Sequence, residues 1–241
     1  LKRLGLYPTN AGSRPAPAKP PKSDWRPILP VPEDAPRQIP AHLFHSKPSA
    51  RWLYKDAQGR LLGLVYRFDH EGGGKTFAPL TFCRGPNGKR EWRWQGFPIP
   101  HPLYGLHDLA ERPDAPVVIP EGEKAADAAQ DLFPDYVAIT WSHGVKAVAK
   151  ADWRPVKDRH VTIWPDNDPQ GQDAAKDAAR ACLDAGAAEV RIVELPQGFP
   201  AKKGWDLADA PPQGWDAEAL RGLLDAATPF TPKDDFRTDT E

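Results

Sequence analysis

The chain has 241 residues, of which 40% are hydrophobic and 27% charged, so it can build the packed core of one large domain or two small ones. No apolar run approaches the roughly 20 residues of a membrane span, so a transmembrane protein is excluded and no membrane partner is expected. The two cysteines are far apart, which excludes a disulfide framework and a cysteine zinc site and favours a reducing, cytoplasmic setting.

The charge is divided unevenly along the chain. Residues 1–112 carry 18 Lys and Arg against nine Asp and Glu, whereas residues 113–241 carry 14 against 24. This asymmetry indicates two modules with different partners. The basic half suits a polyanion. The acidic half can hold cations, although a solvated acidic surface would have the same composition.

The first segment, residues 1–48, contains eleven prolines and little periodicity, which is typical of an extended linker. Its later part, 25–40, also carries apolar residues, as expected of a segment lying along a folded surface.

Residues 49–112 have the pattern of a small basic module of antiparallel β-strands. Aromatic and β-branched runs alternate with turn signals, and Asn87-Gly88 is the strongest hairpin signal. A short helix or turn over 103–111 leads into the next module. The four predicted strands cover 51–55, 61–69, 76–83 and 91–95.

Residues 113–228 switch to an alternation of strands and helices, which predicts an α/β fold with a mostly parallel sheet and flanking helices. A polar tail, 229–241, is expected to fray. The predicted strands are 116–120, 136–140, 160–164 and 190–195, and the predicted helices are 123–133, 146–151, 172–185 and 216–227.

Carboxylates follow three of these strands. Glu121 follows the first, Asp166 and Asp168 the third, and Asp206 and Asp209 lie past a loop after the fourth. The carboxyl ends of parallel strands meet at one sheet edge, so these acids are expected to gather there. Each acid alone also fits turn, helix-dipole or capping chemistry. Together they suit a hard divalent cation, which relieves the repulsion between them.

The stretches VVIPEGEKAADAA, IWPDNDPQG and GWDLADA resemble a TOPRIM domain, the Rossmann-like metal-binding catalytic domain of bacterial-type primases, topoisomerases and some nucleases. The matching signatures are Glu121-Gly122 and Asp166-x-Asp168, within a resemblance that covers about residues 113–227. Residues 100–227 are most similar to primase or primase-helicase proteins of phages and mobile elements, in which a PLY segment, here 102–104, precedes the first signature.

The resemblance implies roles for the acids. Glu121 would be the general base or would shape the metal site, and Asp166 and Asp168 would hold Mg²⁺, or Mn²⁺ in its place. Asp206 would help to bind a second metal, and Asp209 is a further metal candidate. Related primases often carry an Asp where this chain has Ala125. Either Glu123 compensates or the chain has fewer acid ligands.

The resemblance also implies a nucleotide site. Gly144 lies in the loop that stands near the nucleotide in the family. Gly122 and Lys124 complete this set, although Lys124 also suits a solvent-facing position at a helix start.

Template binding is expected from the basic half, because cations that pair with phosphates and aromatic rings that stack on bases form a single-strand platform. The alternative is that these aromatic residues form the core of the module. The candidates are Arg51, Arg67, Lys75, Arg84, Lys89, Arg90, Arg93, Trp92 and Trp94.

The leading functional hypothesis is Mg²⁺-dependent primer synthesis on a single-stranded DNA template from nucleoside triphosphates. The same acids would serve a TOPRIM nuclease, and a non-catalytic nucleic-acid-binding module with a structural metal is a third possibility. No helicase motif is present, so a helicase would be a domain or partner outside this segment.

Overall fold

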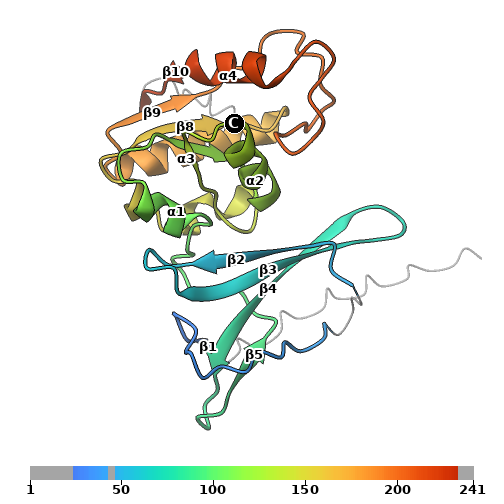
Figure 1. Cartoon of the computed structure of the whole chain (residues 1–241), viewed down its shortest axis with the longest axis vertical. Coiled ribbons are helices and arrows are strands. Elements are labelled where there is room, and N and C mark those ends of the chain that lie inside the picture. Colours follow the sequence, from blue (N-terminus) through green and yellow to red (C-terminus); the bar gives the residue numbers. More distant parts are fainter. Residues whose placement is uncertain (1–23, 43–46, 233–241) are drawn as a thin grey trace, which may run out of the picture.

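A computed structural model describes residues 24–42 and 47–232 of the chain. Parts of the predicted linker (1–23 and 43–46) and most of the predicted tail (233–241) lie outside the described residues. The described chain forms two sheets, an antiparallel module and a parallel-rich sheet flanked by helices (Figure 1). The expected α/β fold preceded by a small antiparallel module is confirmed.

The antiparallel module contains the four predicted strands as β2, β3, β4 and β5, together with β1, which was not predicted. Its strand order is β1-β4-β3-β2, and β5 also pairs with β4. The turn between β4 and β5 is the predicted Asn87-Gly88 hairpin, in which Gly88 adopts φ 79° and donates its N–H to the Gly85 carbonyl. The strands are β1 (Arg26–Pro27), β2 (Ala50–Lys55), β3 (Leu61–Asp69), β4 (Lys75–Arg84) and β5 (Arg90–Arg93).

The described part of the proline-rich segment packs against this module. β1 pairs with the end of β4, and Ile28 donates its N–H to the Phe82 carbonyl. The indole N–H groups of Trp92 and Trp94 donate to the carbonyls of Pro36 and Ala41, at 2.7 Å and 3.3 Å. Residues 24–42 therefore add a strand to the antiparallel sheet and then pack against Trp92 and Trp94, so the folded module begins before residue 49.

The second sheet has the order β10-β9-β8-β6-β7, in which all pairs are parallel except β10 with β9. β10 was not predicted from the sequence. It lies where the predicted tail starts, and Phe230 then donates its N–H to the Val190 carbonyl. The strands are β6 (Val117–Pro120), β7 (Val137–Ala138), β8 (His160–Trp164), β9 (Glu189–Ile192) and β10 (Thr228–Pro229).

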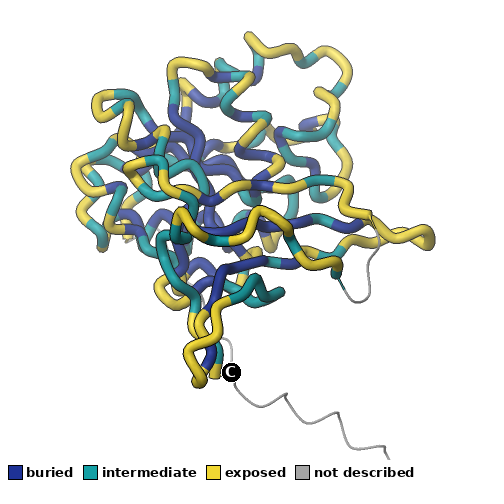
Figure 2. Tube along the Cα trace, turned by 60° about the horizontal axis from the view of Figure 1, so that its bottom comes forward, coloured by how far each residue is buried: buried dark blue, intermediate teal, exposed yellow. Residues whose placement is uncertain are grey.

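Helices cover both faces of this sheet. α2 (Glu123–Leu132) and α4 (Ala217–Asp225) pack on one face with Phe133 and Trp164. α1 (Leu106–Glu111), a 3₁₀ helix (Val145–Lys150) and α3 (Pro169–Asp184) pack on the other. A second 3₁₀ turn spans Arg154–Val156. Figure 2 shows the buried residues concentrated along the strands, with the exposed residues mostly in the loops and turns.

Hydrogen bonds join the two sheets through α2. Trp52 donates its indole N–H to Asp127 and Tyr54 donates its hydroxyl to Glu123, both at 2.7 Å. Trp52 and Tyr54 are two residues apart on β2, so their side chains point to the same face of the sheet. Glu123 and Asp127 are one turn apart on α2, so both acids can accept hydrogen bonds from that face. Tyr104 also donates to Asp127 at 2.7 Å. No helix in the described part of the chain is long and apolar enough to cross a membrane.

Candidate functional site

The first carboxylate stands at a tight corner where β6 passes into α2. Gly122 precedes the helix with φ 85° and ψ 156°, a conformation that side-chain-bearing residues rarely adopt. The buried hydroxyl of Thr140 accepts the Gly122 N–H at 3.0 Å and donates to the Pro120 carbonyl at 2.7 Å. This pair of hydrogen bonds fixes the backbone on both sides of Glu121.

The second group follows β8. Asp168 caps α3 by accepting the Gly171 N–H at 2.8 Å, so the helix starts three residues earlier than predicted, with Pro169 in its first turn. A Cβ at Gly171 would lie 2.7 Å from both the Cβ and the carbonyl oxygen of Asp166. The helix start can therefore pack this closely against Asp166 only because position 171 has no side chain.

The loop after β9 brings the third group to the same edge. The Asn167 N–H donates to the Trp205 carbonyl and the Gly204 N–H donates to the Asn167 carbonyl, both at 2.9 Å. These hydrogen bonds hold Asp206 beside the loop that carries Asp166. The acids were predicted to gather at the carboxyl end of the parallel sheet. For Asp166 and Asp206 this happens because backbone hydrogen bonds join the loops that carry them.

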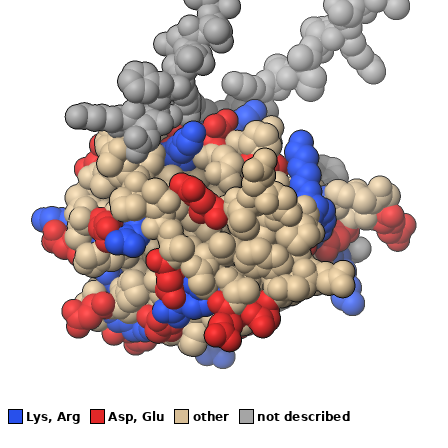
Figure 3. All heavy atoms as spheres, turned by 90° about the horizontal axis from the view of Figure 1, so that it is seen from above, with Lys and Arg blue, Asp and Glu red and all other residues tan. Residues whose placement is uncertain are grey.

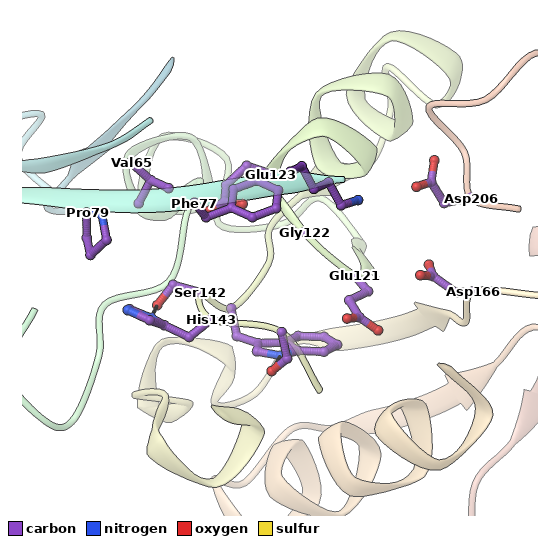
Figure 4. A pocket seen from close by; sticks show the side chains of 13 residues that line it. Val65, Phe77, Pro79, Glu121, Gly122, Glu123, Ser142, His143, Asp166 and Asp206 are labelled. Carbon is purple, nitrogen blue, oxygen red and sulfur yellow. Dashed lines mark hydrogen bonds between the residues drawn. The ribbon is translucent and has the colours of Figure 1, made fainter. Parts of the chain in front are cut away.

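Glu121, Asp166 and Asp206 line one pocket of about 390 Å³. Figure 4 shows them at one end of this pocket, with their carboxyl groups around a shared space. Burial raises the pKa of Asp166 to about 8, and the charges of Glu121 and Asp206 contribute to the rise. Burial also raises the pKa of Glu121, with a further contribution from Asp168. Assembling these acids is electrostatically costly unless a cation accompanies them.

The donor set suits a hard divalent cation, but it is not a closed cage. Among the described residues, no group of three or more His, Cys, Asp or Glu side chains is arranged so that it could hold a metal ion by itself. Mg²⁺ usually takes only one or two carboxylates and completes its shell with water and substrate phosphates. Half-buried carboxylates at the mouth of a pocket fit that mode of binding.

The remaining predicted site residues lie around this cluster. Asp209 forms an ion pair with Lys202 at 3.2 Å, and Lys124 donates to the Ala208 carbonyl at 3.2 Å, tying α2 to the loop of Asp206. Gly144 lines the pocket, and a Cβ there would lie 3.8 Å from Glu121 Oε1.

Two of the predicted template-binding cations face the acids. Lys75 and Arg67 line a second cavity of about 290 Å³ together with Glu121, Asp206 and Asp209. The charge of Lys75 opposes the rise in the pKa of both Glu121 and Asp166. The end of the β3–β4 hairpin therefore places positive charge directly beside the acid cluster.

The other candidates lie elsewhere. Arg84, Lys89, Arg90 and Arg93 surround the β4–β5 hairpin at the opposite end of the module (Figure 1). Arg90 pairs with Asp34, and the guanidinium of Arg93 lies 4.4 Å from the ring centre of Trp25. Arg51 is exposed on β2 and lines a separate cavity against α1.

Trp92 and Trp94 have the core role that the sequence left open as an alternative. Trp92 packs against Phe82, and Trp94 against Tyr66 and Phe68, with ring centres 5.3 to 6.2 Å apart. Both indole N–H groups bond to backbone carbonyls of residues 24–42. Figure 3 views the molecule from above Figure 1, from the side of α4 and β10 and not from that of β5, and shows acidic and basic side chains side by side on the surface seen there.

Three residues near the site have contacts that the sequence did not reveal. Phe77 lines both cavities and is 43% exposed. His143 lines the larger cavity with φ 73°, and its ring stacks on His101 with centres 4.8 Å apart. Glu123 is buried and bonded to Tyr54, so the acid that could have compensated for Ala125 serves the contact between the sheets. The position of Phe77 beside the acids follows from the register of β4 with β3, which the sequence alone does not give.

The sequence was compared with protein-family models and with curated proteins. A family model described as a domain of unknown function, DUF6371, matches residues 65–167. No curated protein matches the sequence.

Several solved structures are similar to this chain at low identity. The zinc-binding and RNA polymerase domains of the Aquifex aeolicus primase are 20% identical over 74% of this chain and 40% of that one, with a TM-score of 0.46. A DnaG catalytic core is 18% identical over 74% and 53%, with a TM-score of 0.47. The primase fragment of the bacteriophage T7 primase-helicase protein is 18% identical over 61% and 52%, with a TM-score of 0.39. This chain spans about half the length, or less, of the first two.

Proposed function

We propose that this chain is the catalytic portion of a primase-type nucleotidyltransferase that makes primers on single-stranded DNA from nucleoside triphosphates. The observation that carries the proposal is the gathering of Glu121, Asp166 and Asp206 at the carboxyl edge of the parallel sheet, opposite Lys75 and Arg67 of the antiparallel module. The TOPRIM motifs that these acids belong to support the same function.

The residues would divide the chemistry as follows. Asp166, Asp168 and Asp206, with Glu121, would hold Mg²⁺ or Mn²⁺, which when bound neutralises charge on the phosphates and favours in-line displacement. Lys75 and Arg67 would bind the triphosphate. Glu121, whose pKa is raised by burial, suits the removal of the proton from the 3′-hydroxyl. The 3′-oxygen then bonds to the α-phosphorus, the bond from that phosphorus to the bridging oxygen breaks, and pyrophosphate leaves.

The cations at the β4–β5 hairpin and on β2 would guide the template, since positive side chains lower the cost of holding a polyanion. A helicase domain or partner would open the duplex. By its motifs the chain would belong to the replication machinery of a phage or mobile element and would act in the cytoplasm.

The test is incorporation of labelled nucleotides on single-stranded DNA with Mg²⁺ or Mn²⁺. Glu121→Gln and Asp166→Asn should each abolish product, whereas Asp131→Asn, an exposed acid on the outer side of α2, should not change the rate. New oligonucleotides from the unmodified chain and the control alone would support the proposal. Cleavage of the DNA without synthesis, lost in the same two variants, would replace it with the nuclease alternative.

A further inference from the structure

The cavity beside the acids has two compartments of different character. The larger is walled on its far side mainly by Val65, Phe77, Pro79 and Trp141, and the smaller by Arg67, Lys75, Lys124 and Lys202. Both contain Phe77, Lys75, Glu121 and Asp206. An apolar chamber therefore adjoins a charged one, in which cations face carboxylates. Two of these cations are ion-paired, Arg67 with Asp69 and Lys202 with Asp209. Glu121 and Asp206 lie at the junction of the two chambers.

Strand register produces this arrangement. Arg67 pairs directly with Phe77, and Val65 with Pro79, so all four lie on the face of the antiparallel sheet that looks toward the acids. Lys75 lies two residues before Phe77 and shares that face, with its ammonium 5.7 Å from the ring centre. In Figure 4 Phe77 stands between the carboxylates at one end of the pocket and Pro79, Ser142 and His143 toward the other.

Phe77 is an aromatic ring that the core does not use. It is 43% exposed, whereas Tyr66, Phe68 and Phe82, which lie on the other face of the same sheet, are buried. The ring of Trp52 backs it with centres 6.2 Å apart, and Trp52 is itself held by Asp127. An exposed ring on a rigid support, at the wall of a pocket of ligand size, is suited to stacking on a flat ligand.

We propose that the apolar compartment is a nucleobase subsite in which Phe77 stacks on the base of a bound nucleoside triphosphate, with the phosphates toward Lys75 and Arg67. A nucleoside triphosphate joins a flat apolar ring to a polyanion. The two compartments offer an apolar wall first and then cations, among them Lys75 and Arg67, beside the acids. The α-phosphate then falls at the junction, beside Glu121, Asp166 and Asp206. This inference rests on the proposed function, because it assigns the base end of that substrate.

The experiment separates the base from the phosphates. Binding of ATP and of inorganic tripolyphosphate to the full chain is measured by calorimetry with Ca²⁺ to prevent turnover. Phe77→Ala should weaken ATP binding about tenfold and leave tripolyphosphate binding unchanged, because stacking acts only on the base. Phe77→Trp should retain ATP affinity. Leu53→Ala removes an equally exposed side chain from the opposite sheet face and should change neither affinity.

Three results would overturn the inference: no ATP binding by the unmodified chain, an equal effect of Phe77→Ala on both ligands, or loss of oligothymidylate binding with ATP binding intact. Thermal unfolding of Phe77→Ala should match the unmodified chain, since the side chain is not part of the core. Phe77-dependent ATP binding by a chain that makes no primers would refute the proposed function and leave this inference standing. Primer synthesis by a chain whose ATP affinity does not depend on Phe77 would support the proposed function and refute this inference.

Discussion

The two sheets contribute to the site by different routes. The parallel sheet supplies acids from the ends of its strands, where chain order alone brings them to one edge. The antiparallel sheet supplies Arg67, Lys75 and Phe77 from within its strands β3 and β4. These residues reach the site because the strand register places their side chains on the face that looks toward the acids. Strand ends can be located from sequence. The face and register of a meander depend on its packing, so the basic module holds both site residues and ordinary surface residues.

The largest expected effect is a difference in nucleotide incorporation rate between variants of two lysines, Lys75 and Lys47. Lys75→Ala should lower nucleotide incorporation about 100-fold, because it removes a positive charge from the place where phosphate charge develops. Lys47→Ala removes an exposed lysine ahead of β2 and should change the rate less than twofold. Steady-state rates on one template would measure both. Equal effects would show that the module acts through its overall charge and not through the face it turns to the acids.

The contact between the sheets should also be measurable as stability. Tyr54→Phe removes the hydroxyl that donates to the buried Glu123, and an unpaired buried acceptor costs about 1–3 kcal/mol. The midpoint of chemical denaturation should fall accordingly. Tyr136→Phe removes a hydroxyl from a half-buried ring just before β7 of the parallel sheet and should leave the midpoint nearly unchanged. A Tyr54 variant as stable as the unmodified chain would contradict this assignment.

The burial of Asp166, together with its repulsion by neighbouring acids, predicts a pH dependence of stability. The pKa of Asp166 rises from 3.8 to about 8 on folding, so ionisation costs stability progressively between about pH 4 and pH 8. Asp166→Asn should therefore raise the melting temperature in EDTA by several degrees at pH 8 and by much less at pH 5. Scanning calorimetry at the two pH values measures this. A gain that does not grow with pH would mean that neither burial nor the neighbouring acids raise the pKa of this carboxyl group.

The smallest effect is expected at the distant hairpin. Arg84→Ala should weaken binding of a single-stranded oligonucleotide a few-fold and reduce its salt dependence by about one counterion. Nucleotide affinity should stay the same. Arg60→Ala, which breaks an exposed ion pair in the β2–β3 turn, is the matched control. Fluorescence anisotropy over a salt series distinguishes the two, and identical curves would remove the hairpin from the template path.

Much of this organisation could be predicted from the sequence. Hydrophobic periodicity located the four longer strands of the module and most strands and helices of the parallel-rich layer. Strand-end reasoning placed Glu121, Asp166 and Asp206 together. β1 and β10 were missed because strands of two residues carry no periodicity. Trp92 and Trp94 were ambiguous because their partners lie more than fifty residues away in the proline-rich segment. Glu123 could not be separated from the candidate metal-binding acids without knowing that Tyr54 donates a hydrogen bond to it.

The close packing at Gly171 makes the geometry of Asp166 depend on a residue that has no functional group. Any side chain at position 171 must push back the Asp166 backbone or unwind the start of α3. Random mutagenesis should thus find inactivating changes there in every chemical class, from alanine upward, in proteins that still fold. A position of that kind would be passed over in a search for reactive groups, yet it tolerates variation as little as the carboxylate beside it.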